Sequence, residues 1–316
     1  MKKFDVITIG SAVRDILFRT DAAEIVKNPK HDPTKLALIG FEYGAKIHSK
    51  QVHRYYGGGA SNTAVAMARL GLKVAIATRV GNDPDGQAIT AHFKAQHVGT
   101  QFIQHDPKHN TGLSFLIIET KTNEHVALVD YGANQHFVLP QAVVSAAPRW
   151  FYVSALSTPS WASIMRQLTK TKAKLAWNPG SFQLAGYKQL VPLLKKTAVL
   201  ILNKDEATEL SVRTKLAPAQ FGAEIVVVTD GRHGAVAYTK QRAHKVTVSA
   251  KPAKDTTGAG DAFGSSLVAG LIRTNGNLPL ALQIAAINAT AEVSHIGVQQ
   301  GLLRWPDIQK QLKRRR

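Results

Sequence analysis

Short apolar runs alternate with longer helical patterns along almost the whole chain. Short apolar runs predict buried strands at 5–10, 73–81, 150–155, 173–177, 199–202 and 225–229. Apolar residues at helical spacing predict helices over 57–71, 85–97, 260–273 and 278–294. This order predicts an α/β fold: a doubly wound, largely parallel sheet with helices on both faces. In such folds, ligands bind at the carboxyl ends of the strands.

Two segments do not fit this alternation. The runs 111–120 and 124–133 alternate apolar and polar residues and are separated by three residues, which predicts a β-hairpin. The polar stretch 21–35 contains two prolines and is too long for an ordinary connection between elements. The polar stretch is therefore either an inserted lid or a mobile loop. On the first interpretation the chain is a single domain over residues 1–316, and its small β lid is formed by segments at about 15–54 and 111–133.

The composition is that of a folded globular protein, with 44% hydrophobic and 19% charged residues among 316. The chain has no cysteine, which excludes disulfides, thiol catalysis and cysteine-based zinc sites. This absence favours the reducing cytoplasm as the compartment. No apolar stretch is long enough to span a bilayer, and the first residues do not resemble a signal peptide. We expect a cytoplasmic protein without a membrane partner.

The formal net charge is +19. Such an excess suits nucleic acid, an anionic membrane surface or small anions such as nucleotides, and charge alone does not choose among them. The one dense basic run, Lys310 to Arg316, is explained more simply as a solvated chain end than as a nucleic-acid contact. No zinc-finger or RNA-recognition motif accompanies it. A basic protein that binds nucleotides or nucleic acid is the non-enzymatic alternative.

The most informative short segment is 255–263, Asp-Thr-Thr-Gly-Ala-Gly-Asp-Ala-Phe, which puts a glycine turn before an apolar helix. Backbone N–H groups converge at such a turn and the helix dipole adds partial positive charge, so the turn is suited to bind an anion. Gly258, Ala259 and Gly260 would supply the N–H groups. Asp261 follows in the first helical turn, where the dipole favours a carboxylate and we expect a low pKa.

An ionised carboxylate beside an anion site is suited to accept a proton from a hydroxyl that attacks a phosphoryl group. The plainer alternative is that Asp255 or Thr256 caps the helix and that Asp261 only stabilises its first turn. Two common nucleotide motifs are missing. The turn lacks the third glycine of a dinucleotide fingerprint, and the chain contains no P-loop. Hydride transfer and P-loop chemistry are therefore not favoured.

Two stretches resemble the signatures of the ribokinase-like sugar kinases, also called the phosphofructokinase B (PfkB) family. Residues 255–263 are similar to the C-terminal signature, and residues 57–71, Gly-Gly-Gly-Ala-Ser-Asn and onward, to the N-terminal one. Further similar stretches lie at 5–16, 80–86, 202–206 and 228–238, so the resemblance extends over nearly the whole chain. It implies a ribokinase-like fold and a kinase that transfers the γ-phosphoryl group of ATP to an alcohol, with Mg2+ as cofactor.

The resemblance also implies roles for single residues on the phosphate side. Asp261 is the implied catalytic base, and the amides of Gly258, Ala259 and Gly260 form the implied anion hole. Asn203 and Glu206 match an Asn-x-x-Glu motif that organises Mg2+ and phosphates largely through water, although the plainer alternative is a helix that begins with acids. The implied contacts to the nucleotide are completed by Thr229, Gly231 and, on the adenine side, Asn288.

On the acceptor side, Asp15 matches the aspartate that holds substrate hydroxyls, and Gly58, Gly59 and Asn62 match the contacts of the N-terminal signature. Relatives often have a lysine where this chain has Gly59, so ribose itself is in doubt as the acceptor. Asp255 and Thr257 begin the loop where many relatives bind K+.

The leading hypothesis is an ATP-dependent kinase of a sugar or sugar-like acceptor, and the first alternative is an adenosine-like nucleoside kinase of the same fold. The long insert before residue 54 is similar to the lids of nucleoside-phosphorylating relatives. A homodimer is a further expectation, because many relatives pair through lid strands whose edges are exposed.

Overall fold

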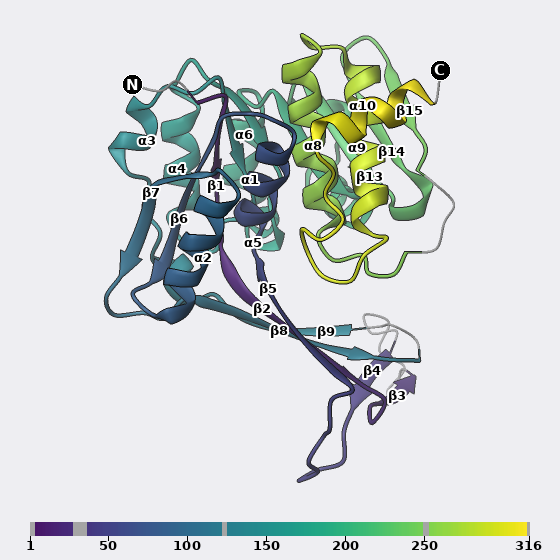
Figure 1. Ribbon diagram of the computed structural model, residues 1–316. Helices are drawn as coiled ribbons and strands as arrows, with labels where there is room; N and C mark the ends of the chain where they lie inside the picture. The colour runs from purple at the N-terminus through teal and green to yellow at the C-terminus, as the bar shows by residue number, and fades with distance from the viewer. Residues whose placement is uncertain (1–3, 28–36, 122–124, 249–252, 315–316) are drawn as a thin grey trace.

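The computed structural model describes residues 4–27, 37–121, 125–248 and 253–314. Parts of the expected lid segments, the first residue of the expected second hairpin strand and the last two arginines lie outside these residues. Figure 1 shows a large layered body with a small sheet that projects from one end. No helix among the described residues combines the length and the apolar character that crossing a bilayer requires.

A nine-stranded sheet forms the centre of the described chain, in the order β15-β14-β13-β12-β11-β10-β1-β6-β7. Its strands are β1 (Val6–Ile9), β6 (Val74–Gly81), β7 (Gly99–Asp106), β10 (Trp150–Val153), β11 (Lys174–Trp177), β12 (Val199–Asn203), β13 (Ile225–Thr229), β14 (Ala235–Tyr238) and β15 (Ala243–Val246). Neighbouring strands are parallel from β13 to β7, and the two pairs at the other edge are antiparallel. The expected doubly wound, largely parallel sheet is confirmed.

Strand β1 lies between β10 and β6, so the chain first builds the sheet toward β7 and then returns to build toward β15. A strand order that changes direction leaves a crevice at the carboxyl ends of the two central strands, because their connections leave to opposite sides. The candidate site described below lies at these ends of β1 and β10.

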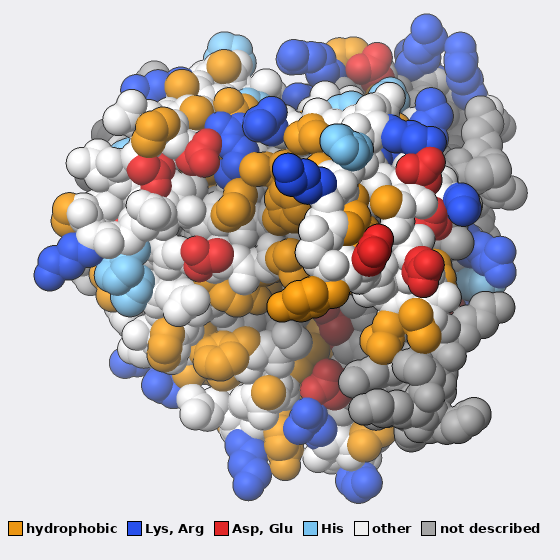
Figure 2. Space-filling view, turned by 90° about the horizontal axis from the view of Figure 1, so that it is seen from below, with side chains coloured by type: hydrophobic (Ala, Val, Ile, Leu, Met, Phe, Trp, Pro, Cys, Tyr) orange, Lys and Arg blue, Asp and Glu red, His pale blue; other side chains and the backbone are white. Residues whose placement is uncertain are grey.

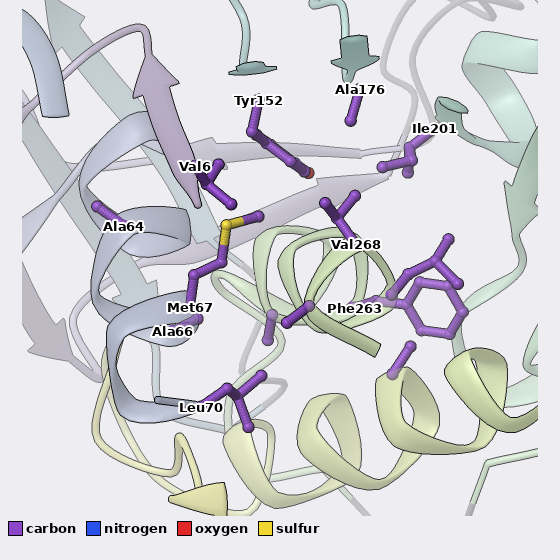
Figure 3. Packing of buried hydrophobic residues seen from close by; sticks show 14 of the residues in the cluster. Val6, Ala64, Ala66, Met67, Leu70, Tyr152, Ala176, Ile201, Phe263 and Val268 are labelled. Carbon is purple, nitrogen blue, oxygen red and sulfur yellow. The ribbon is translucent and has the colours of Figure 1, made fainter. Parts of the chain in front are cut away.

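Helices cover both faces of the sheet, because successive strand residues point to opposite sides. One face is covered by α1 (Gly59–Arg69), α2 (Pro84–Ala95), α8 (Ala259–Arg273), α9 (Leu278–Glu292) and α10 (Trp305–Lys313). The other is covered by α3 (Gln141–Ser145), α4 (Trp161–Leu168), α5 (Ser181–Ala185), α6 (Tyr187–Leu194) and α7 (Lys204–Thr214). Figure 3 shows the first of these layers, where Met67 of α1 and Val268 of α8 pack beneath Tyr152 of β10.

The small sheet has the order β5-β2-β8-β9. Its strands are β2 (Val13–Thr20), β5 (Gln51–Gly57), β8 (Gly112–Glu119) and β9 (His125–Asp130). The expected hairpin is confirmed as the antiparallel pair β8 and β9, and β2 and β5 come from the first expected lid segment. A separate pair, β3 (Glu24–Lys27) and β4 (Ala37–Gly40), lies within the first expected lid segment.

Several elements were not expected from the pattern, among them β5, β7 and α10. Strands β5 and β7 complete the two sheets. The basic C-terminal run is not simply a solvated end, because Lys310 and Lys313 belong to α10, which packs Ile308 into the core. Trp305, Ile308 and Leu312 follow one another at helical spacing and give a sequence signal for this helix.

Candidate active site

The beginning of α8 lies beside the beginning of α1. Gly258 precedes α8 at φ +78°, in the left-handed region that glycine adopts without strain. Gly58 precedes α1 at φ +93°, where a Cβ atom would lie 2.5 Å from the carbonyl oxygen of Ser11. Both helices therefore begin at tight glycine turns. The two turns meet, since a Cβ atom on Gly59 would lie 3.5 Å from Oδ1 of Asp261.

The N–H groups of the 258–260 turn are only partly free. Ala259 donates its N–H to the carbonyl oxygen of Thr256 at 3.2 Å, so its amide is not the free donor that we expected. Within the described ranges, the N–H groups of Gly258 and Gly260 have no protein acceptor. A Cβ atom on Gly260 would meet no other atom within 4 Å, so the backbone is open to a ligand at that position.

Asp261 is partly buried in the first turn of α8. The expectation of a low pKa is wrong, because burial raises the pKa of its carboxyl to about 6. Removing the carboxylate from water outweighs the helix dipole, which acts mainly on exposed groups and contributes about 0.3–1 kcal/mol there. The Asn62 amide opposes the shift, because Nδ2 donates to Oδ2 of Asp261 at 2.8 Å and lowers the pKa of the carboxyl. In most molecules the Asp261 carboxyl group is therefore ionised at neutral pH.

Asp15 is a second buried carboxyl group at this place, 6% exposed on β2. Burial and the nearby negative charge of Asp261 raise its pKa to about 7, and a hydrogen bond from Ser114 on β8 lowers it. Gly57 on β5 makes room for this carboxyl group, since a Cβ atom there would lie 1.8 Å from Oδ2 of Asp15. The structure thus brings together four residues that the sequence indicated, Asp15, Gly59, Asn62 and Asp261.

Asn203 and Glu206 lie together at the carboxyl end of β12. Asn203 Oδ1 accepts from the Glu206 N–H at 2.8 Å, and Glu206 Oε2 accepts from the Asn203 N–H at 2.8 Å. This is a capping box at the start of α7, so the plainer structural role is present. Oε1 of Glu206 has no partner among the described residues and can receive a further hydrogen bond.

Thr229 lies beside Asn203 in the next strand, β13. Its hydroxyl donates to the carbonyl oxygen of Leu202 at 3.4 Å. Gly231 follows at φ +48° with open space around its α-carbon. Asn203, Thr229 and Gly231 therefore share one end of two adjacent strands, as the expected nucleotide contacts require.

Asn288 lies elsewhere. It is fully buried between α8 and α9, where Nδ2 donates to Ser266 Oγ at 2.7 Å and Oδ1 accepts from the Leu303 N–H at 2.8 Å. Both polar atoms of its amide are hydrogen-bonded inside the protein, so the structure gives the expected adenine contact no support.

Asp255 and Thr257 form a turn that is tied to the segment after α9. The Asp255 carboxylate accepts from the Thr257 N–H at 2.9 Å and from the Gly297 N–H at 2.9 Å. No group of three or more acidic or histidine side chains suited to hold a metal ion occurs in the described part of the chain. A cation at either expected place would therefore combine at most two such side chains with backbone carbonyl groups or water.

The sequence reasoning missed Gln299, which contacts the residues around Asp261. Gln299 is 3% exposed, and its Nε2 lies 3.0 Å from Oδ1 of Asn62. The two residues are far apart in the chain, and neither stands in a local motif that would link them. The only signal in the sequence is that Gln299 follows a glycine, Gly297, in a segment rich in turn residues.

Comparison with known proteins gives consistent results. A model of the pfkB family of carbohydrate kinases matches residues 26–305. The ribokinase of Haemophilus influenzae is 28% identical over 259 residues, which cover 78% of this chain and 84% of that protein. The structure of the nucleoside kinase of Methanocaldococcus jannaschii aligns with a TM-score of 0.80 over 99% of both chains, at 20% identity. A nucleoside kinase of Burkholderia thailandensis, in complex with ADP-inosine, aligns with a TM-score of 0.82 at 18% identity, over 98% of this chain and 95% of that one.

The likeness of the solved structures agrees with the observed fold, and the family model covers most of the sequence. On this evidence the chain belongs to the pfkB family of carbohydrate kinases, which are phosphotransferases that use an alcohol group as acceptor.

Proposed function

We propose that this protein transfers the γ-phosphoryl group of ATP to a hydroxyl group of a sugar or sugar-like acceptor. One observation carries the proposal: the Asp261 carboxylate lies at the start of α8 beside the free N–H groups of Gly258 and Gly260, and Asn62 holds it there. A base next to an anion site is what phosphoryl transfer to an alcohol requires.

Asp261 accepts the proton of the attacking hydroxyl at a carboxylate oxygen. With a pKa of about 6 it is a stronger base than an exposed aspartate, and it is still mostly ionised at pH 7. The N–H groups of Gly258 and Gly260 stabilise the charge on the transferred group, since they are fixed before the reaction. Ala259 contributes when its weak contact with Thr256 opens.

Asp15 and the Gly58–Gly59 turn position the acceptor. A carboxyl group together with an amide such as that of Asn62 can bind two neighbouring hydroxyl groups through directed hydrogen bonds. The small sheet carries Asp15 and lies at the same end of the molecule, so we propose that it acts as a lid that excludes water from the transferred phosphoryl group.

On the nucleotide side, Asn203, Glu206, Thr229 and Gly231 would contact the phosphates and ribose of ATP. Mg2+ neutralises phosphate charge when it is bound. Glu206 suits its hydrated shell, because Oε1 is free to bind a water molecule. The structure supports K+ beside Asp255 and Thr257 less well, because the Asp255 carboxylate already accepts hydrogen bonds from two backbone N–H groups.

A nucleoside is the second candidate acceptor. A Cβ atom on Gly59 would lie 2.7 Å from Cβ of Ser154, so the site has no room there for the lysine of many sugar kinases. The nucleoside kinase of Burkholderia thailandensis that shares this fold is described in complex with inosine. Both observations favour an acceptor other than free ribose.

A panel of acceptors tests the proposal directly. Purified protein is assayed for ADP release with ATP and Mg2+ against ribose, fructose, fructose 6-phosphate, adenosine, inosine and cytidine, with and without K+. We expect one sugar or nucleoside to raise ADP release well above the rate without acceptor. If no acceptor does so while the protein binds ATP, the proposed reaction is wrong.

The non-enzymatic alternative makes a different prediction from the same net charge. Figure 2 shows hydrophobic, acidic and basic side chains mixed on the face seen from below, rather than a continuous basic surface. A nucleic-acid-binding protein would bind duplex DNA with an affinity that falls steeply with salt. Such binding without phosphoryl transfer would favour that alternative.

A further inference from the structure

Gln299 connects several elements around Asp261. Its backbone has φ +68°, in the left-handed region that few residues other than glycine adopt. The backbone is held from two sides, because its N–H donates to the Glu292 carboxylate and its carbonyl oxygen accepts from Nη1 of Arg69 at 2.6 Å. An unusual conformation held by charged partners fixes the side chain in one place.

Every polar atom of the Gln299 side chain has a partner. Nε2 lies 2.7 Å from the carbonyl oxygen of Tyr56, 3.1 Å from Ser61 Oγ and 3.0 Å from Oδ1 of Asn62. Oε1 lies 2.9 Å from Nε2 of His92. A carbonyl oxygen can only accept a hydrogen bond, so the contact with Tyr56 fixes which end of the Gln299 amide is the NH2 group.

The orientation of Gln299 determines the orientation of Asn62. Because Gln299 donates to Oδ1 of Asn62, the Nδ2 group of Asn62 points away from Gln299 and toward Oδ2 of Asp261, 2.8 Å distant. If the Asn62 amide turned over, it would present an oxygen to the carboxylate and its NH2 group to another NH2 group. Both contacts would be repulsive in a buried place.

We propose that Gln299 is a positioning residue for phosphoryl transfer: through Asn62 it presents an N–H group to the catalytic carboxylate of Asp261. The inference rests on the proposed function, since it assigns a role within the same site. Gln299 itself does not touch the reacting atoms in this scheme. The carbonyl group of Tyr56, on the edge strand β5 of the small sheet, thereby fixes the orientation of the amide at the first turn of α8.

Other charged and titratable groups face this arrangement. Asp15 on β2 and Tyr152 on β10 interact electrostatically with Asp261. On the side of Gln299, Arg69 and Glu292 bind its backbone and His92 binds its side chain. Burial raises the pKa of Asp261, and the hydrogen bond from Asn62 lowers it. Loss of this hydrogen bond should therefore raise the pKa further.

The test replaces Gln299 by methionine, which has similar length and no amide. Two readouts are taken: the pH titration of the Asp261 carboxyl carbon by 13C NMR, and the pH dependence of kcat/KM for the best acceptor. Asp261→Asn and Asp15→Asn assign the two carboxyl signals. Gln300→Met is the matched control, since Gln300 is exposed and, among the residues that the structure describes, its side chain bonds only the nearby carbonyl oxygen of Val298.

In Gln299→Met we expect the titration midpoint of Asp261 and the acidic limb of kcat/KM to move up by roughly one pH unit. The variant then loses about fivefold in kcat/KM at pH 6 and little at pH 8.5. Gln300→Met should match the wild type. If Gln299→Met does not fold, Gln299→Asn, which keeps the amide but shortens its reach, takes its place with the same expected shift.

A double variant separates positioning from general packing. Asn62→Ala should produce the same shift, and Gln299→Met combined with Asn62→Ala should add nothing, because one acts through the other. Additive losses, or losses without a change in pH dependence, would overturn the inference. If the NMR midpoint moves as expected but the wild type transfers no phosphoryl group to any acceptor, the positioning stands and the proposed function fails.

Discussion

At the scale of residues, two neighbouring carboxyl groups share one buried place and both are harder to ionise than usual. Asp15 and Asp261 have pKa values near 7 and 6 because each loses contact with water and, for Asp15, because Asp261 is negative. A fold that buries two acids at one point is less stable when both are charged. This loss of stability is the expected consequence of placing a base and a substrate-binding carboxyl group together.

Asp15→Asn tests this consequence through stability. The folded protein keeps the Asp15 proton up to pH about 7, whereas the unfolded chain releases it near pH 4. Folded protein thus binds more protons in this window, and its stability falls as pH rises from 4 to 7. The unfolding free energy of Asp15→Asn, relative to that of the wild type, should therefore rise by about 3 kcal/mol between pH 4.5 and pH 8.

The measurement is urea unfolding of both proteins at the two pH values, with Asp230→Asn as a control at a surface aspartate that pairs with Lys204. If the difference in unfolding free energy between Asp15→Asn and the wild type stays constant over this range, folding does not raise the pKa of Asp15.

At the scale of elements, the N-terminal turn of α8 was the part of the site that the sequence revealed best. Glycines, a helix and an acid in its first turn are all local features, so a motif displays them together. The pKa of Asp261 was not predictable in this way, because the groups that surround it, such as Asn62 on α1 and Asp15 on β2, are distant in sequence. The Gln299 contact was missed for the same reason, since it joins residues 237 positions apart.

The parallel sheet was predicted well because its strands are continuous buried runs, such as Val226 and Val227 in β13. Strand β7 was missed because polar residues interrupt its apolar pattern. The capping box of Asn203 and Glu206 shows that a structural role and a proposed phosphate role can occupy the same residues.

Gly260→Ala tests the proposed anion site at the start of α8. A Cβ atom at this position meets no protein atom, and alanine favours helix over glycine, so the variant should be as stable as the wild type or more stable by about 0.5–1 kcal/mol. If a phosphoryl group occupies the open space, the methyl group obstructs it, and kcat/KM should fall roughly a hundredfold.

Gly276→Ala is the contrasting control, at a position with equal space but with φ +88° and no proposed ligand. It should lower the unfolding temperature and leave the acceptor and ATP kinetics unchanged. If Gly260→Ala keeps full activity, the transferred phosphoryl group does not occupy the space beside residue 260.

At the scale of the whole molecule, no further strand pairs with either edge of the small sheet, β5 or β9, within the described ranges, and β9 exposes apolar side chains. Leu128 is 55% exposed and Val126 is 40% exposed. Unpaired edges with exposed apolar residues favour association with another chain. We therefore propose a homodimer that pairs through the lids, as expected from the resemblance.

Leu128→Glu tests this dimer, with Val212→Glu as the control at an apolar residue that is 63% exposed on α7. Light scattering after size-exclusion chromatography should give the mass of two chains for the wild type and for Val212→Glu, and of one chain for Leu128→Glu. A wild type that remains a monomer at tens of micromolar concentration would contradict the pairing.

The central claim is that the Asp261 carboxylate removes the proton from the acceptor hydroxyl. The most direct measurement is kcat for Asp261→Asn with the best acceptor, together with the affinity for ATP by calorimetry. We expect kcat to fall by roughly 10²–10⁴-fold, the contribution of a general base, with ATP affinity within a few fold of the wild type. Turnover close to that of the wild type would contradict the account.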